Sequence, residues 1–308
     1  MKKYADIIAV FVALALIIGA IFLSYYFYKS SQPAKIYGID YSPFRDGQSP
    51  LTETYPSDDE IVQDLSILSY ETKTILIYAT TDFYHQIPKM ANDAGLDCFA
   101  GAWLDSNPIA NQNRIENLIE IGKSGYASTL IVGSEVLSRG DLSEEQLIKD
   151  LNLVKIAVPG VAVTYSNTPK ELLAHPKIVK SSDFISANMY PFWEGVPIEK
   201  AVENINNDYE KLKTAYPDKE IVITETGWPS SGDSQKEAIA SPENQARFLS
   251  EFVKWADDKN IKYFIFEAFD ENWKSEYPDS PEKYWGLWQS DRTLKPEIEK
   301  FFKTGVNY

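Results

Sequence analysis

Cysteine and histidine are nearly absent from this 308-residue chain. The one cysteine, Cys98, cannot form an intramolecular disulfide and excludes a zinc cluster built from thiolates. The two histidines, His85 and His175, are isolated from each other, which leaves no histidine-based metal site and no obvious Ser-His triad. We therefore expect neither a metal ion nor a cofactor.

Basic residues are also scarce. The chain has 30 Lys and Arg against 45 Asp and Glu, for a formal charge of -15. Nucleic acid binding needs a surplus of basic side chains facing phosphates, so we expect no nucleic acid partner. Aromatic residues are plentiful, with 7 Trp, 19 Tyr and 15 Phe, which is not the composition of a disordered acidic protein. The chemistry of this chain must come mainly from carboxylates.

The first 35 residues differ from the rest of the chain. No charge occurs between Asp6 and Lys29, and about 20 apolar residues span a bilayer as a helix. Residues 7–28 are therefore predicted to form a transmembrane signal anchor. Residues 1–6 would be cytoplasmic, and residues 29–35 would form a linker.

The orientation of this segment follows from its flanks. Lys2 and Lys3 favour a cytoplasmic N-terminus. A cleavable secretory signal is the alternative, but the apolar run ends in the bulky aromatics of residues 25–28, with no small-residue cleavage site. We expect a membrane-anchored protein with the lipid bilayer as a partner and an extracytoplasmic catalytic domain. Under the alternative the domain is secreted.

Beyond the linker, apolar segments rich in β-branched and aromatic residues alternate with helical patterns, which is typical of βα units around a parallel sheet. Eight strands within residues 36–308 fit one (β/α)8 TIM barrel domain in size and order. A doubly wound open sheet is the alternative, but no Gly-rich dinucleotide loop follows the first strand. The predicted strands are Ile36–Tyr41, Thr74–Ala79, Asp97–Trp103, Thr129–Ser134, Val161–Tyr165, Phe184–Met189, Ile221–Thr224 and Tyr263–Glu267.

Glutamates follow three of these strands, at the end of a barrel where reactive side chains lie. Glu135 follows the fourth strand, Glu225 the seventh, and Glu267 ends the eighth. One such glutamate could be a solvated surface carboxylate. Two that face each other across a barrel mouth are what glycoside hydrolysis requires, one to protonate the leaving oxygen and one to attack or to activate water.

Distinctive motifs surround these glutamates. Ile221–Ser230 reads IVITETGWPS, Val132–Leu137 reads VGSEVL, Phe266–Lys274 reads FEAFDENWK, and Tyr37–Pro43 reads YGIDYSP. These segments resemble the nucleophile, acid/base, eighth-strand and first-strand motifs of glycoside hydrolase family 17, the β-1,3-glucanases and related β-1,3-glucosyltransferases. The resemblance covers residues 36–302, and it implies a (β/α)8 barrel with retaining chemistry.

The resemblance also implies roles for single residues. Glu225 would be the nucleophile and Glu135 the general acid/base. Glu267 and Lys274 match charged groups near the nucleophile and would tune its charge and orientation. Tyr190 ends the sixth strand, where related barrels place a hydroxyl against the nucleophile; packing at the barrel rim is the alternative for this side chain.

One position departs from the family pattern. The family usually has Asn directly before the acid/base glutamate, and this chain has Ser134. That Asn binds the sugar 2-hydroxyl, a contact that strengthens in the transition state. Ser is shorter, so the contact would be lost, bridged by water or made by another residue.

Aromatic residues near strand ends are candidates to bind sugar, because neutral glucans offer apolar ring faces to flat side chains. Trp103 and Trp273 are the first candidates, since each is followed or preceded by polar loop residues. Packing in the core is the alternative for any of them. The other candidates are Tyr41, Trp193 and Trp228.

The sequence thus predicts a retaining glycoside hydrolase that cleaves β-1,3-glucan, as polysaccharide or oligosaccharide, or a similar β-linked glucan. A β-1,3-glucan glucosyltransferase, in which a sugar hydroxyl replaces water, is the alternative within enzymes. A non-catalytic, membrane-tethered glucan-binding protein is the alternative of another class. The presence of both Glu135 and Glu225 favours catalysis.

Overall fold

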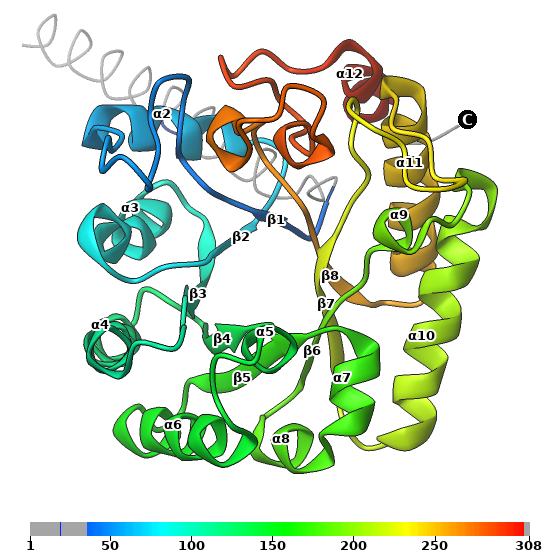
Figure 1. Cartoon of the computed structure of the whole chain (residues 1–308). Coiled ribbons are helices and arrows are strands. Elements are labelled where there is room, and N and C mark those ends of the chain that lie inside the picture. Colours follow the sequence, from blue (N-terminus) through cyan, green and yellow to red (C-terminus); the bar gives the residue numbers. More distant parts are fainter. Residues whose placement is uncertain (1–18, 20–35, 305–308) are drawn as a thin grey trace, which may run out of the picture. The chain divides into compact units, whose positions relative to one another are not determined.

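Eight parallel strands pair in sequence order, and β8 pairs with β1, so the sheet closes into a barrel (Figure 1). The computed structural model describes Gly19 and residues 36–304. This topology confirms the predicted (β/α)8 barrel and rules out the open sheet. The strands are β1 Gly38–Asp40, β2 Thr74–Ile77, β3 Asp97–Ala102, β4 Thr129–Ser134, β5 Ala162–Asn167, β6 Ile185–Asn188, β7 Ile221–Thr226 and β8 Lys262–Ile265.

Helices follow the strands and surround the barrel (Figure 1). Local sequence sets their ends: α2 begins after Ser57, which forms a reciprocal capping box with Glu60. The helices are α2 Asp58–Leu68, α3 Ile87–Asp93, α4 Pro108–Ser124, α5 Val136–Arg139, α6 Glu144–Ala157, α7 Pro169–Ala174, α8 Pro176–Ser181, α9 Pro191–Glu194, α10 Ala201–Ala215, α11 Pro242–Asp258 and α12 Pro296–Thr304. Short 3-10 turns are η1 Asp82–Gln86, η2 Ile198–Lys200, η3 Asn272–Lys274 and η4 Pro281–Lys283.

The interior of the barrel changes from apolar to polar toward the site. Its apolar layer consists of Leu76, Phe99, Ile131, Phe184, Val222 and Phe264. Closer to the C-terminal ends of the strands, the hydroxyls of Ser166 and Ser186 are hydrogen-bonded to each other, and both contact the hydroxyl of Thr224. The barrel therefore offers an apolar floor and a hydrogen-bonding wall to the groups at its mouth.

A buried ion cluster holds the loop between β1 and α2. The carboxylate of Asp64 on α2 is fully buried and accepts hydrogen bonds from Arg292 at 2.7 Å and Arg45 at 2.8 Å. Arg292 also donates to the backbone carbonyls of Pro43 at 2.8 Å and Phe44 at 3.3 Å. A residue that follows the last strand thereby fixes the loop that follows the first.

Residues 7–28, predicted as the membrane anchor, lie outside the described residues apart from Gly19, and so do residues 1–6 and 29–35. Within Gly19 and residues 36–304, no helix combines the length and the apolar character that a membrane crossing needs.

Asp64→Asn is expected to lower the free energy of unfolding by about 3–5 kcal/mol, because losing one partner of a buried ion pair leaves the other charge uncompensated. Thermal unfolding of the full-length chain would show the change as a lower midpoint. Asp93→Asn is the control: it removes one side of the exposed pair between Lys89 and Asp93, and we expect no change in its midpoint. Equal midpoints for both variants and the parent would contradict the stabilising role of the cluster.

Candidate active site

Irregularities in the strands place the two glutamates at the barrel mouth. The register shifts between β4 and β5 around Ser134 and between β6 and β7 at Asn188; such bulges re-aim side chains next to active sites. Glu135 has a φ of 57°, in the left-handed region that non-glycine residues seldom occupy. Its backbone N–H donates to Ser166 on β5 at 2.9 Å, which holds the turn in place.

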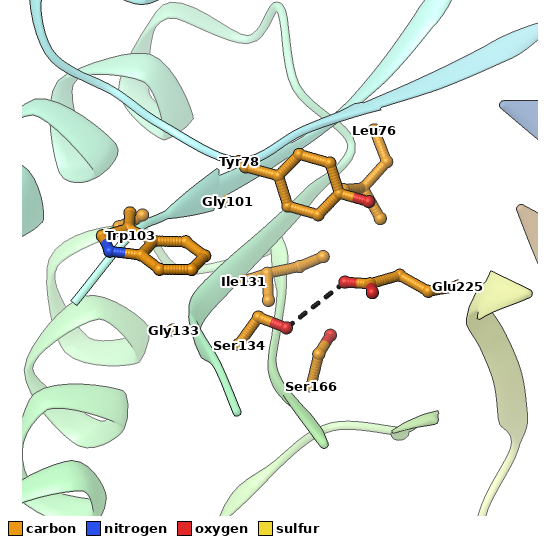
Figure 2. Close-up of a pocket in the computed structure, with 10 residues that line it drawn as sticks. Leu76, Tyr78, Gly101, Trp103, Ile131, Gly133, Ser134, Ser166 and Glu225 are labelled. Carbon is orange, nitrogen blue, oxygen red and sulfur yellow. Dashed lines mark hydrogen bonds between the residues drawn. The ribbon is translucent and has the colours of Figure 1, made fainter. Parts of the chain in front are cut away.

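Hydrogen bonds connect the two predicted catalytic carboxylates. The hydroxyl of Ser134 donates to Oε1 of Glu225 at 3.3 Å (Figure 2). The side-chain amide of Asn188 donates to Ser134 Oγ at 3.2 Å and to Glu135 Oε1 at 3.1 Å. In turn, Asn188 Oδ1 accepts from Thr224 at 3.0 Å. The barrel thus brings Glu135 and Glu225 together through Ser134 and Asn188.

Burial and like charge shape the electrostatics of the nucleophile candidate. Burial, followed by the negative charge of Glu135, raises the pKa of Glu225 to about 8, against the opposing hydrogen bonds from Tyr190 and Ser134. Tyr190 donates to Glu225 Oε2 at 2.8 Å, so the contact expected for Tyr190 is present. Burial and the charge of Glu225 raise the pKa of Tyr190 well above its ordinary value, which keeps this hydroxyl protonated as a donor.

A further carboxyl lies close to the nucleophile candidate. Asp40, at the end of β1, is fully buried. Burial and the charge of Glu225 raise its pKa well above the ordinary value, whereas the hydroxyl of Tyr78 lowers it. Burial and the neighbouring charges of Asp40 and Glu225 raise the pKa of Tyr78 well above its ordinary value. A protonated Asp40 avoids adding a second buried charge beside the nucleophile.

Lys274 lies between two buried carboxylates at the end of β8. Its Nζ is 2.6 and 2.7 Å from the two oxygens of Glu267 and 3.0 Å from Glu271. Burial lowers the pKa of Lys274, but these carboxylates outweigh it and leave the pKa raised. Ser42 and the indole of Trp273 also donate to Glu271, at 2.5 and 2.8 Å. The predicted supporting residues Glu267 and Lys274 therefore form one charged cluster.

A cleft of about 640 Å³ crosses the barrel mouth, a volume typical of sites that bind ligands of several rings. Glu135, Glu225, Lys274, Trp103 and Trp273 line it, together with the loops after β1 and β2. With Ser134 and Glu267, which also line it, seven of the predicted site residues share one cavity.

Arg139 supports Trp103 at one wall of this cleft. The guanidinium lies 4.4 Å from the centroid of the Trp103 ring. It also donates to the carbonyls of Ser134 at 2.7 Å and Leu104 at 2.8 Å. Trp103 remains 44% exposed, and Figure 2 shows its ring directed toward the space beside Glu225. Arg139 therefore fixes an exposed aromatic ring beside the carboxylates.

Three aromatic candidates do not face the cleft. Tyr41 is fully buried and donates to Asp64 at 3.3 Å, and Trp228 is 1% exposed, with its indole N–H bonded to the carbonyl of Ile239. The prediction that Tyr41 and Trp228 bind substrate is wrong in both cases, because these side chains point away from the barrel mouth. Trp193 is 37% exposed but packs against Trp285 outside the cleft lining.

Sequence reasoning missed Asn188, Asp40 and Arg139. Asn188 and Asp40 are polar residues inside buried strands, and a buried polar group needs a partner, which was a readable signal. For Arg139, on the exposed turn after Glu135, no local signal distinguishes it from any surface arginine.

Comparison with known proteins identifies the family. Residues 38–286 match the BtgE/BtgC glycoside hydrolase domain. The chain belongs to this family. The btgC protein of Aspergillus niger is 30% identical to it over 294 residues, which cover 85% of this chain and 43% of that protein. The glucan endo-1,3-β-glucosidase btgC of Emericella nidulans is 26% identical over 302 residues, which cover 85% and 45%. This BtgE/BtgC family chain therefore spans less than half the length of these curated relatives.

Solved structures share the fold over nearly their whole length. A glycoside hydrolase family 17 β-1,3-glucanosyltransferase from Rhizomucor miehei has a TM-score of 0.77 and 29% identity, covering 86% of this chain and 97% of that one. An active-site mutant of the Rhizomucor miehei β-1,3-glucanosyltransferase, in complex with laminaritriose, has the same TM-score of 0.77 and 28% identity. Both are similar to this BtgE/BtgC family chain.

Glu135→Gln is expected to lower the pKa of Glu225 from about 8, because the substitution removes the negative charge that contributes most after burial. A 13C NMR titration of the Glu225 carboxyl in the full-length chain measures this directly, with the signal assigned through Glu225→Gln. Glu120→Gln, on α4, is the control and should leave the midpoint unchanged. An equally unchanged midpoint in Glu135→Gln would show that burial alone sets the pKa.

Proposed function

We propose that this BtgE/BtgC family chain is a retaining glycoside hydrolase of the family 17 type that acts on β-1,3-glucan. The observation that carries the proposal is the pair of Glu135 and Glu225, connected by hydrogen bonds through Ser134 and Asn188 within one cleft. The names of the btgC relatives and the laminaritriose complex of the Rhizomucor miehei enzyme support this substrate class.

In the first step, a carboxylate oxygen of Glu225 forms a bond to the anomeric carbon of the bound sugar. The bond from that carbon to the leaving oxygen breaks, and Glu135 transfers its proton to this oxygen. Glu225 must therefore be ionised in the reacting complex, with the shared proton on Glu135. Tyr190 donates to Glu225 Oε2, which leaves Oε1 and its partner Ser134 on the other side of the carboxylate.

In the second step, Glu135 acts as a base. It removes a proton from water or from a sugar hydroxyl, whose oxygen attacks the anomeric carbon and releases Glu225. Hydrolysis and glucosyl transfer thus share the glycosyl-enzyme and differ only in the acceptor. The similarity to a β-1,3-glucanosyltransferase is the observation that keeps transfer as a second candidate function.

Ser134 and Asn188 together replace the family Asn in this scheme. The Ser134 hydroxyl and the Asn188 amide both lie beside the two carboxylates, where the 2-hydroxyl of a reacting sugar would be placed. A hydroxyl and an amide can jointly supply the donor and acceptor that one Asn side chain offers. In this scheme the two side chains would exchange their present hydrogen bonds for the sugar 2-hydroxyl when the substrate binds.

The uncharged run of residues 7–28 supports a membrane anchor and an exported catalytic domain as part of the same proposal. The mass of the mature N-terminus distinguishes an anchor from a cleaved leader.

Glu225→Ala is expected to lower turnover of laminari-oligosaccharides at least about 10⁴-fold while leaving the fold intact, because the reaction loses its nucleophile. Mass spectrometry of products from the full-length chain measures this: shorter products show hydrolysis, and products longer than the substrate show transfer. The exposed Glu276→Ala is the control. Azide should restore turnover of an activated aryl β-glucoside by Glu225→Ala and yield the α-glucosyl azide. Unreduced turnover would contradict the assignment of Glu225.

Ser134→Ala is expected to lower kcat/KM roughly tenfold, the effect of a lost hydrogen bond to a charged or reacting group. The loss should be smaller for a 2-deoxyglucoside, which lacks the hydroxyl that Ser134 would contact. Ser134→Asn is the matched variant and should keep most of the activity. If Ser134→Ala impairs both substrates equally, the sugar contact is contradicted and Ser134 acts on Glu225 alone.

A further inference from the structure

We propose that the cleft contains a distal subsite, formed by Leu51, Tyr55 and Phe83, that binds a glucosyl unit remote from the bond being cleaved. This inference rests on the proposed function and extends it to the length of chain that the protein holds. Nothing in the motifs around the glutamates points to these residues, which lie in the loops after β1 and β2.

The first observation is continuity with the catalytic pair. Leu51, Tyr55 and Phe83 line the same cavity as Glu135 and Glu225. In a barrel whose strands are ordered β1 to β8, β2 and β1 are two and three strands away from β4, so the loops that follow them lie at a distance from Glu135 along the rim of the mouth. A ligand that extends from Glu135 toward these loops is therefore longer than one sugar ring.

The second observation is a chain of aromatic contacts along this part of the cleft. The rings of Trp273 and Phe44 have centroids 5.4 Å apart, and Phe44 and Phe83 are 5.7 Å apart. Phe83 stacks on Tyr84 at 4.4 Å and contacts Tyr55 at 5.3 Å. Aromatic side chains thus continue from the charged cluster of Lys274 to the outer edge of the cleft.

The third observation is that this apolar surface stays open. Tyr55 is 39% exposed and Leu51 is 79% exposed. Leu51 lies within, and Tyr55 directly after, a tight hairpin in which Ser49 and Thr54 exchange backbone hydrogen bonds of 3.0 and 3.1 Å. Exposed apolar side chains gathered at one end of a cleft mark a binding surface, and the hairpin presents them in a fixed arrangement.

The chemistry of the surface fits a neutral sugar. Flat rings pack against the CH-bearing face of a glucosyl unit, and the exposed carboxylate of Asp82 and the hydroxyl of Thr81 in the same lining can accept hydrogen bonds from sugar hydroxyls. Asp82 also repels an acidic polysaccharide. The occupant is therefore a distal unit of the neutral β-glucan whose reacting bond lies between Glu135 and Glu225.

Binding measurements test the subsite without relying on turnover. Isothermal titration of full-length Glu225→Gln with laminari-oligosaccharides of two to six units should show affinity that rises with length. Adding Tyr55→Ala should weaken the longest oligosaccharides about tenfold and laminaribiose less than twofold, as expected for loss of one aromatic contact. Tyr55→Phe should restore the affinity, because the ring face carries the contact. Tyr70→Ala, on the loop after α2, is the matched control, and Leu51→Ser is the second test variant.

The outcomes separate the subsite from the proposed function. A uniform loss at every length in Tyr55→Ala, or no loss at any length in both Tyr55→Ala and Leu51→Ser, would overturn the subsite while leaving catalysis standing. Length-dependent binding by a chain that cleaves no glucan would overturn the function and keep the subsite. If Glu225→Gln binds no oligosaccharide of any length, the subsite is also overturned.

Discussion

The constraint on which the rest of this site depends is a buried carboxylate, Glu225, placed next to a second, half-buried one, Glu135. Like charges in a buried position repel and resist ionisation together. Hydrogen-bond donors offset this repulsion: Ser134 and Tyr190 donate to Glu225, and Asn188 donates to Glu135. Acid catalysis and nucleophilic attack need two carboxyls in different surroundings, one that holds a proton and one that is ionised.

The barrel supplies the positions for these donors. Ser134 comes from the end of β4, whereas Asn188 and Tyr190 come from the end of β6. The register shifts at Ser134 and Asn188 lie where these side chains meet the carboxylates. Below them the hydroxyls of Ser166, Ser186 and Thr224 are bonded to one another. A wall whose hydrogen bonds are satisfied internally has little freedom to rearrange when charge moves above it.

The sequence predicts the strands and the two glutamates of this site, but not the direction in which each side chain points. Periodicity and apolar runs identify all eight strands, because a buried parallel strand is apolar on both faces, and the glutamates stand out since they end those runs. Tyr41 and Trp228 also stand at strand ends, yet neighbouring residues point to opposite sides, so one of two lies in the core. Asn188 and Arg139 act through partners far away in the sequence, which only the closed barrel brings within reach.

The buried ion pair of Arg292 and Asp64 joins residues 228 positions apart in the sequence. A growing polypeptide emerges from the ribosome with its N-terminal part first. Until Arg292 has emerged, the carbonyls of Pro43 and Phe44 lack the cation that fixes them. One wall of the cleft is therefore completed only after residue 292 has been synthesised, and a chain cut short before residue 292 would keep both glutamates without a complete place for a glucan.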